Sequence, residues 1–364
     1  MAELGTPTSS ISLSGRRRRR WKLVVLALLF GSLLGILLLE ITFRVYVAAR
    51  GWTPNCYRPQ PQLVQSHPVN GYELRPGFEF RSATTHISIN SHGLRSEEPT
   101  GQKPLLVTLG GSAAFGYLVS NEETASALLE EMFREQGLEI DVQNGGVPGY
   151  NLNQTLVRFR ERIAPLEPDY VLLYLGWNDT PYIVSDDPDA PRFQRGESPA
   201  AWKRWLSYST LYGFIRSRLP SGNTQLVPPV SVSVTPTEKG GKRFHENLNR
   251  LADEVRELDA ELIVCCPIMA AHPEVREALY GYLSEDPKQR EALIALGAWL
   301  HAELERFANE RGAIWIDGWR PPTEAFLGDA IHLTKTGEAM MAELWFQSLR
   351  QHGIKTKSDP ESIP

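Results

Sequence analysis

A serine follows two glycines at the end of an apolar run. Residues 104–109 (PLLVTL) have the length of a buried strand, and Gly110, Gly111 and Ser112 come next. A serine on a tight glycine turn that leads into a helix exposes its hydroxyl and its own backbone N–H, which suits a nucleophile whose amide helps to hold an oxyanion. A glycine turn with a capping serine has the same local sequence. A phosphate cradle would need a P-loop lysine or GxGxxG spacing, and this turn has neither.

An aspartate and a histidine lie three positions apart near the other end of the chain. Asp329 and His332 (in DAIH) directly precede a helical pattern. At this spacing the carboxylate can accept a hydrogen bond from one imidazole nitrogen while the other nitrogen faces a cleft as a general base. The pair could instead bind a metal, but no further His or carboxylate motif offers an obvious third ligand. We therefore expect neither a metal nor an organic cofactor.

Two further loops could supply hydrogen-bond donors. Gly149, within NGGVPGYN, lets the backbone approach a ligand with its N–H exposed. Asn178, within GWND, could donate from its side-chain amide at the end of a strand, although an Asx turn leaving a strand is at least as common. Trp177 either lines an acyl-binding site or packs in the core.

The elements that must position these residues alternate between strands and helices. This alternation implies a parallel sheet covered by helices on both faces, and such a sheet carries its chemistry on loops at the carboxyl ends of its strands. The apolar runs predict strands at 104–110, 138–144, 169–176, 261–268 and 313–317, and helices at 121–137, from 151, and at 243–258, 288–311 and 335–350.

The four motifs occur in the order that is typical of SGNH (GDSL-like) hydrolases. GGSA, NGGVPGYN, GWND and DAIHLTKTG together resemble the four blocks of that family over about residues 104–350. DxxH and GxND are the more specific of these motifs. The resemblance implies an α/β protein with the flavodoxin-like three-layer α/β/α fold around a central parallel sheet, here preceded by one transmembrane helix.

The resemblance also implies a role for each matched residue. Ser112 would be the nucleophile, His332 the general base and Asp329 its orienting partner. The backbone N–H groups of Ser112 and Gly149 and the side chain of Asn178 would form the oxyanion hole.

One position departs from the family's pattern. The GDS motif usually has an aspartate where this chain has Gly111. In the family that residue shapes the turn and is not the nucleophile, so the departure bears on lipase-like specificity more than on catalysis.

The N-terminal region reads as a membrane anchor. Arg16–Arg20 run directly into an apolar segment that carries no charge from Leu23 to Leu39. A helix over residues 21–43 can cross the roughly 30 Å hydrocarbon core of a bilayer, with Glu40 near the far interface. The basic cluster predicts a cytoplasmic N-terminus and an extracytoplasmic main domain. A cleaved signal peptide is the alternative, but its apolar region would be unusually long.

Charge is distributed unevenly along the chain. Residues 1–50 carry eight Arg and Lys against two Glu, a net charge of +6. Because the whole chain has a net charge of −5, the remaining residues have a net charge of −11. An acidic main domain argues against nucleic acid as a partner. The predicted organisation is a basic cytoplasmic N-terminus (1–20), an anchor (21–43), a juxtamembrane accessory segment (44–102), a catalytic domain (103–350) with an insertion (181–242), and a tail (351–364).

These patterns predict a membrane-anchored serine esterase or deacetylase. It would act through an acyl-Ser112 intermediate on an acylated glycan or lipid outside the cytoplasmic membrane, in the periplasm if the cell has an outer membrane. An O-acetyltransferase that modifies an envelope glycan would use the same residues, and a non-catalytic binding module is the third hypothesis.

Overall fold

The computed structural model describes nine parts of the chain, and these belong to two compact units. The described residues are 13–50, 63–81, 85–117, 119–186, 206, 209–218, 235–266, 287–318 and 332–354. One unit comprises Met1–Gln60 with Trp205–Leu219, and the other comprises Pro61–Arg204 with Pro220–Pro364.

The second unit is built on a five-stranded parallel sheet. Its strands are β5 (Leu105–Gly110), β6 (Asp141–Asn144), β7 (Tyr170–Tyr174), β8 (Glu261–Cys265) and β9 (Ile314–Ile316), in the spatial order β6-β5-β7-β8-β9. Counted along the chain, this is the doubly wound order 2-1-3-4-5, whose topological switch point lies beside the first strand. The predicted fold class is confirmed.

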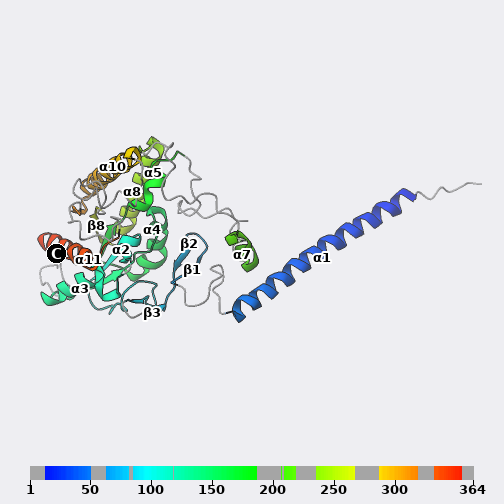
Figure 1. Ribbon diagram of the computed structural model, residues 1–364, viewed down its shortest axis with the longest axis horizontal. Helices are drawn as coiled ribbons and strands as arrows, with labels where there is room; N and C mark the ends of the chain where they lie inside the picture. The colour runs from blue at the N-terminus through cyan, green and yellow to red at the C-terminus, as the bar shows by residue number, and fades with distance from the viewer. Residues whose placement is uncertain are drawn as a thin grey trace, which may run out of the picture. The chain divides into compact units, whose positions relative to one another are not determined.

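Helices cover both faces of the sheet (Figure 1). Alternate strand residues point to opposite faces, so Leu106 and Leu172 join one apolar core while Val107 and Leu173 join the other. The first core is closed by α3 (Ala125–Glu135) and α11 (Lys335–Gln351), which lie side by side. The second is closed by α4 (Leu152–Arg158), α8 (Glu238–Arg256) and α10 (Pro287–Arg311).

Short elements complete this unit. They are α2 (Ser112–Phe115), η1 (Asn121–Glu123), the π-helical turn η2 (Phe159–Ile163), η3 (Ala164–Leu166), η4 (Trp177–Asp179) and α5 (Thr180–Ile183).

Two hairpins precede the sheet and pack against segments that follow its first two strands. β1 (Val64–His67) pairs with β2 (Gly71–Leu74), and β3 (Glu79–Arg81) pairs with β4 (His86–Ser88), both antiparallel. Leu74, Phe78 and Ile89 form a third apolar cluster with Phe115, Val147 and Tyr150, which come from the loops that follow β5 and β6. Part of the predicted accessory segment thus supports these two loops.

The start of α8 differs from the sequence prediction. α8 begins at Glu238, which lies inside the expected insertion (181–242). The apolar pattern placed the start of this helix near 243. Thr237 caps the helix by accepting from the N–H of Gly240 at 3.0 Å. Gly240 packs so closely on Ile183 that a Cβ there would lie under 3.0 Å from the Ile183 carbonyl oxygen. Gly240 is needed for this packing, but glycine has a low helix propensity. The sequence pattern therefore did not predict a helix at this position.

The first unit contains the long N-terminal helix α1 (Leu13–Ala49) and the short helix α7 (Thr210–Arg218). Among the described residues, Arg20–Ala49 is the one helix that is long and apolar enough to cross a membrane, with a mean hydropathy of 2.6. The Glu40 carboxylate accepts from the N–H of Thr210 at 2.7 Å and of Leu211 at 3.0 Å. It thereby satisfies amides at the start of α7 that have no partner within the helix.

A buried carboxyl group connects α11 to α3. Glu338 is 1% exposed and its Oε2 accepts from the N–H of Ala125 at 2.7 Å. Burial raises the pKa of Glu338 to about 8, although the charge of Arg95 opposes the shift. The folded protein therefore keeps this proton up to about pH 8, while the unfolded chain releases it near its ordinary value of 4.5.

Stability should accordingly fall between pH 4.5 and pH 8 through this one group. The contribution is fully present below pH 4.5 and is lost as the pH rises through 8, with a slope of up to about 1.4 kcal/mol per pH unit. We expect Glu338→Gln to flatten that part of the stability profile, measured by urea unfolding from pH 4 to pH 9. Equal slopes in the variant and the wild type would contradict this assignment.

Candidate active site

Ser112 and His332 lie within hydrogen-bonding distance although 220 residues separate them in the chain. The distance from Ser112 Oγ to His332 Nε2 is 2.8 Å, and both side chains are half-buried. The serine hydroxyl can donate to Nε2 when that nitrogen carries no proton, which is the geometry of a nucleophile and its general base.

The turn before Ser112 requires glycine at position 110. Gly110 pairs with Tyr174 across β5 and β7, and a Cβ there would lie under 3.0 Å from both the Tyr174 carbonyl oxygen and Ala114 Cβ. The chain can thus turn sharply from β5 into α2. Ser112 is the first residue of α2, so its N–H has no acceptor within that helix.

Asn178 joins the loops that follow β6 and β7. It lies in η4, and its Nδ2 donates to the carbonyl oxygen of Tyr150 at 2.8 Å. A side-chain amide carries two N–H donors, so the second can serve a ligand. The predicted amide donor therefore sits beside the residue that follows Gly149.

The glycine at position 111, where the family's pattern has an aspartate, lies close against Asn178. A Cβ on residue 111 would lie under 3.0 Å from Asn178 Nδ2 and 3.2 Å from the Tyr150 carbonyl oxygen. An aspartate could be accommodated only if the Asn178 amide moved. The position of the Asn178 amide therefore depends on residue 111 having no side chain.

The Gly149 loop is fixed from both sides. Gly149 is exposed and has φ +82°, a conformation that favours glycine. Before it, the N–H of Val147 donates to the Gly110 carbonyl oxygen at 3.0 Å. After it, Asn151 and Gln154 form the predicted capping box at the start of α4, with the N–H of Gln154 donating to Asn151 Oδ1 at 3.0 Å.

A buried aspartate ties the same loops together. Asp179 is 3% exposed, and its Oδ1 accepts from the N–H of Leu152 at 2.8 Å. Burial raises the pKa of Asp179 to about 7. Residue 179 thus joins the turn that carries Asn178 to the first residue of α4.

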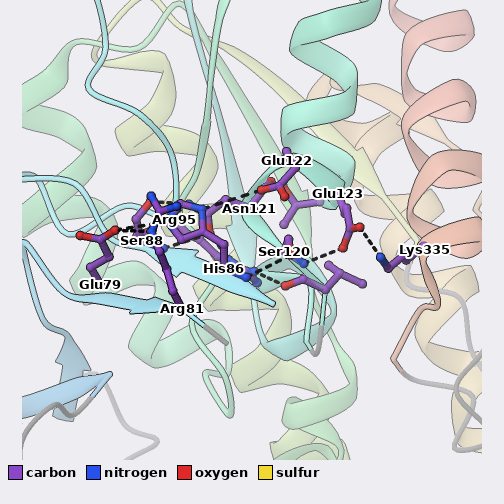
Figure 2. A network of polar contacts seen from close by, with 12 residues as sticks. Glu79, Arg81, His86, Ser88, Arg95, Ser120, Asn121, Glu122, Glu123 and Lys335 are labelled. Atoms are coloured by element: carbon purple, nitrogen blue, oxygen red, sulfur yellow. Dashed lines mark hydrogen bonds and ion pairs between the residues drawn. The ribbon is translucent and has the colours of Figure 1, made fainter. Parts of the chain in front are cut away.

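Arg95 holds the far end of the helix that carries Ser112. Its buried guanidinium donates to the carbonyl oxygens of Phe115 at 2.7 Å and Gly116 at 2.5 Å, and to Asn121 Oδ1 at 2.9 Å. Figure 2 shows the hydrogen bond between Arg95 and Asn121 within a larger polar network.

The network reaches the segment that carries His332. Asn121 also donates to the Ser88 carbonyl oxygen in β4 at 2.9 Å. Glu123 accepts from the N–H of Ser120 at 2.9 Å and pairs with Lys335, three residues after His332 (Figure 2). The hairpin, the loop after α2 and the start of α11 are therefore connected.

The other predicted residues have different outcomes. Asp329 lies outside the described residues, so its orienting role stays a prediction. Trp177 is partly buried and packs against both cores of the sheet; its contact with substrate also stays a prediction. Within the described ranges, no group of three or more His, Cys, Asp or Glu side chains could hold a metal ion.

Two tyrosines near this site could not be identified as site residues from the sequence. The Tyr117 ring lies 4.7 Å from the His332 ring between centroids and is 42% exposed. Tyr72 comes from β2, and its hydroxyl donates to the Pro148 carbonyl oxygen at 2.6 Å. Neither residue belongs to a recognisable motif, and neither contact could be inferred without the fold.

The sheet is doubly wound, and the Ser112–His332 pair has the geometry of a serine-hydrolase site. Residues 108–340 match the GDSL-like Lipase/Acylhydrolase family. The chain therefore belongs to that family, as its four motifs indicated.

Individual proteins resemble the chain more distantly. An arylesterase of Vibrio mimicus is 34% identical over 74 residues, which are 20% of this chain and 37% of that protein. The chain thus spans little more than a third of that relative. Crystal structures of the esterase EstA from Pseudoalteromonas sp. and of the acetylxylan esterase Axe2 from Geobacillus stearothermophilus are 13% and 14% identical. The EstA match covers 68% of this chain and 97% of EstA, with a TM-score of 0.42. The Axe2 match covers 69% of this chain and 95% of Axe2, with a TM-score of 0.40.

The coupling between Gly111 and Asn178 can be tested by a double-mutant cycle. Gly111→Ala should displace the Asn178 amide and lower kcat for ester hydrolysis by up to about a hundredfold, the low end of what loss of one oxyanion donor costs. In an Asn178→Ala background the same substitution should cost little, because the clashing group is gone. Additive losses measured across the cycle would refute the coupling.

Proposed function

We propose that the chain is a membrane-anchored serine esterase or deacetylase that acts on acylated molecules outside the cytoplasm. The observation that carries the proposal is the 2.8 Å contact between Ser112 Oγ and His332 Nε2. The Gly149 and Asn178 loops beside that contact support it, because acyl transfer needs donors for an oxyanion next to the nucleophile.

The reaction would proceed through an acyl-enzyme. His332 takes the hydroxyl proton as Ser112 Oγ attacks the ester carbonyl carbon, and the oxyanion is held by the N–H groups of Ser112 and Gly149 and the amide of Asn178. The alcohol then leaves with the proton from His332. Water next gives a proton to His332 and attacks the acyl carbonyl, and Ser112 recovers its proton as the carboxylic acid departs.

The N-terminal helix supports the proposed location. The part of α1 from Arg20 to Ala49 has the length and apolar character of a membrane span, and the run of arginines that leads into it favours a cytoplasmic N-terminus. The catalytic residues would then face the other side of the membrane, where acylated glycans and lipids of the cell envelope are the available substrates.

Tyr117 favours an ester of a sugar. Its exposed ring lies against the ring of His332, the residue that would protonate the leaving alcohol. An aromatic face at this point offers an apolar surface to the alcohol part of the ester, and the C–H face of a sugar ring fits such a surface.

The proposal is tested by labelling the full-length chain in detergent with a fluorophosphonate. The probe should modify Ser112, and Ser112→Ala should remain unlabelled. His332→Ala should lower ester hydrolysis by at least about a thousandfold. His352→Ala is the matched control, because His352 is exposed at the end of α11 and should retain activity.

Failure of a folded wild-type protein to react at Ser112 would refute the proposal. A second measurement separates hydrolysis from transfer: acetyl release from a chromogenic ester is followed with and without a polysaccharide acceptor. Consumption that depends on the acceptor would indicate an O-acetyltransferase instead.

Tyr117 should govern the affinity for the sugar part. We expect Tyr117→Ala to raise KM for an acetylated oligosaccharide by up to about tenfold, corresponding to ~1.4 kcal/mol, with little change in kcat. Tyr117→Phe should keep the wild-type KM, since the ring is what makes the contact. Unchanged KM in the alanine variant would show that the ring does not bind the substrate.

A further inference from the structure

Tyr72 contacts the peptide unit that carries one of the proposed oxyanion donors. Its hydroxyl donates to the Pro148 carbonyl oxygen at 2.6 Å. That carbonyl and the N–H of Gly149 belong to the same peptide unit. A hydrogen bond to one end of the unit therefore acts on the other end.

The planarity of the peptide bond makes this connection rigid. The C=O and N–H of a trans peptide lie in one plane and point in opposite directions. Fixing the Pro148 carbonyl toward Tyr72 therefore aims the Gly149 N–H away from Tyr72. Gly149 is also the residue that permits the contact, because a Cβ there would lie 2.6 Å from the Tyr72 hydroxyl.

Tyr72 is itself held in place by the hairpin and by α4. Its ring meets the Tyr150 ring edge-on with centroids 5.3 Å apart, and the Tyr150 hydroxyl donates to the Tyr72 carbonyl oxygen. Asn70 and Gln154 exchange two hydrogen bonds of 3.0 Å between their side-chain amides and backbone carbonyls. Burial raises the pKa of Tyr72, so its hydroxyl remains a donor.

We propose that Tyr72 is a positioning residue of the oxyanion hole, and that it acts by fixing and polarising the Pro148–Gly149 peptide. Hydrogen bonds in a chain strengthen one another, so donation to the carbonyl makes the Gly149 N–H a better donor. Tyr72 precedes the residues that match the family. The hairpin would thus contribute to catalysis from outside the four motifs. This inference rests on the proposed esterase function.

The test is Tyr72→Phe in the full-length chain, which removes the hydroxyl and keeps the ring. We expect kcat for an ester to fall about tenfold, equivalent to ~1.4 kcal/mol, with KM within about twofold of the wild type. The control is Tyr170→Phe, a buried tyrosine at the start of β7, at the opposite end of that strand from Asn178. It should leave kcat unchanged.

A thionoester substrate separates positioning from general loosening. Sulfur accepts hydrogen bonds weakly, so the oxyanion donors contribute less to its hydrolysis. The ratio of ester to thionoester rates should therefore fall in Tyr72→Phe and stay constant in Tyr170→Phe. An unchanged kcat in Tyr72→Phe, or equal losses on both substrates, would overturn the positioning role.

The two proposals fail in different ways. If the wild type reacts with fluorophosphonate at Ser112 and Tyr72→Phe matches it in rate, only the positioning role is overturned. If the folded wild type does not react, both are overturned.

Discussion

The parallel pairing of β5 with both β6 and β7 is the constraint on which the site depends. Parallel strands end at the same edge of a sheet, so the three loops that follow these strands meet there even though the chain separates them. Ser112, Gly149 and Asn178 each lie on one of these loops. The site lies beside β5, where the winding of the sheet reverses, as expected for open α/β sheets.

Meeting at one edge is not sufficient, because oxyanion donors must be held to within a fraction of an ångström. Here close backbone approach does much of this work. Gly110 packs on the Tyr174 carbonyl, Gly111 leaves room for the Asn178 amide, and Asn178 bonds the Tyr150 carbonyl. The positions of the proposed donors therefore depend on one another.

The segment before the sheet, with its two hairpins and the loop that follows them, adds a second layer of support. Arg95 bonds the carbonyl oxygens at the end of α2, and Tyr72 bonds the loop after β6. Arg95 and Tyr72 both donate to backbone carbonyl oxygens. Residues outside the family's motifs can in this way position the loops on which the motifs lie. Part of the predicted accessory segment thus belongs to the structure around the site.

The sequence predicted the sheet well, for physical reasons that can be named, and the structure brings the predicted pair Ser112 and His332 together. Buried parallel strands such as 105–110 are continuous apolar runs, and the capping box at Asn151 is a local pattern. The start of α8 was misplaced because Gly240 serves a tertiary contact. Tyr72, Tyr117 and the contacts of Arg95 could not be predicted, because they depend on how distant segments pack.

The central claim is that three loops form one oxyanion hole beside Ser112. The most direct measurement is a crystal structure of the full-length chain after reaction with a fluorophosphonate. If the three loops form one oxyanion hole, phosphorus should be bonded to Ser112 Oγ, with a phosphonyl oxygen about 3 Å from the N–H groups of Ser112 and Gly149 and the amide of Asn178. A phosphonyl oxygen directed away from Gly149 and Asn178 would contradict it.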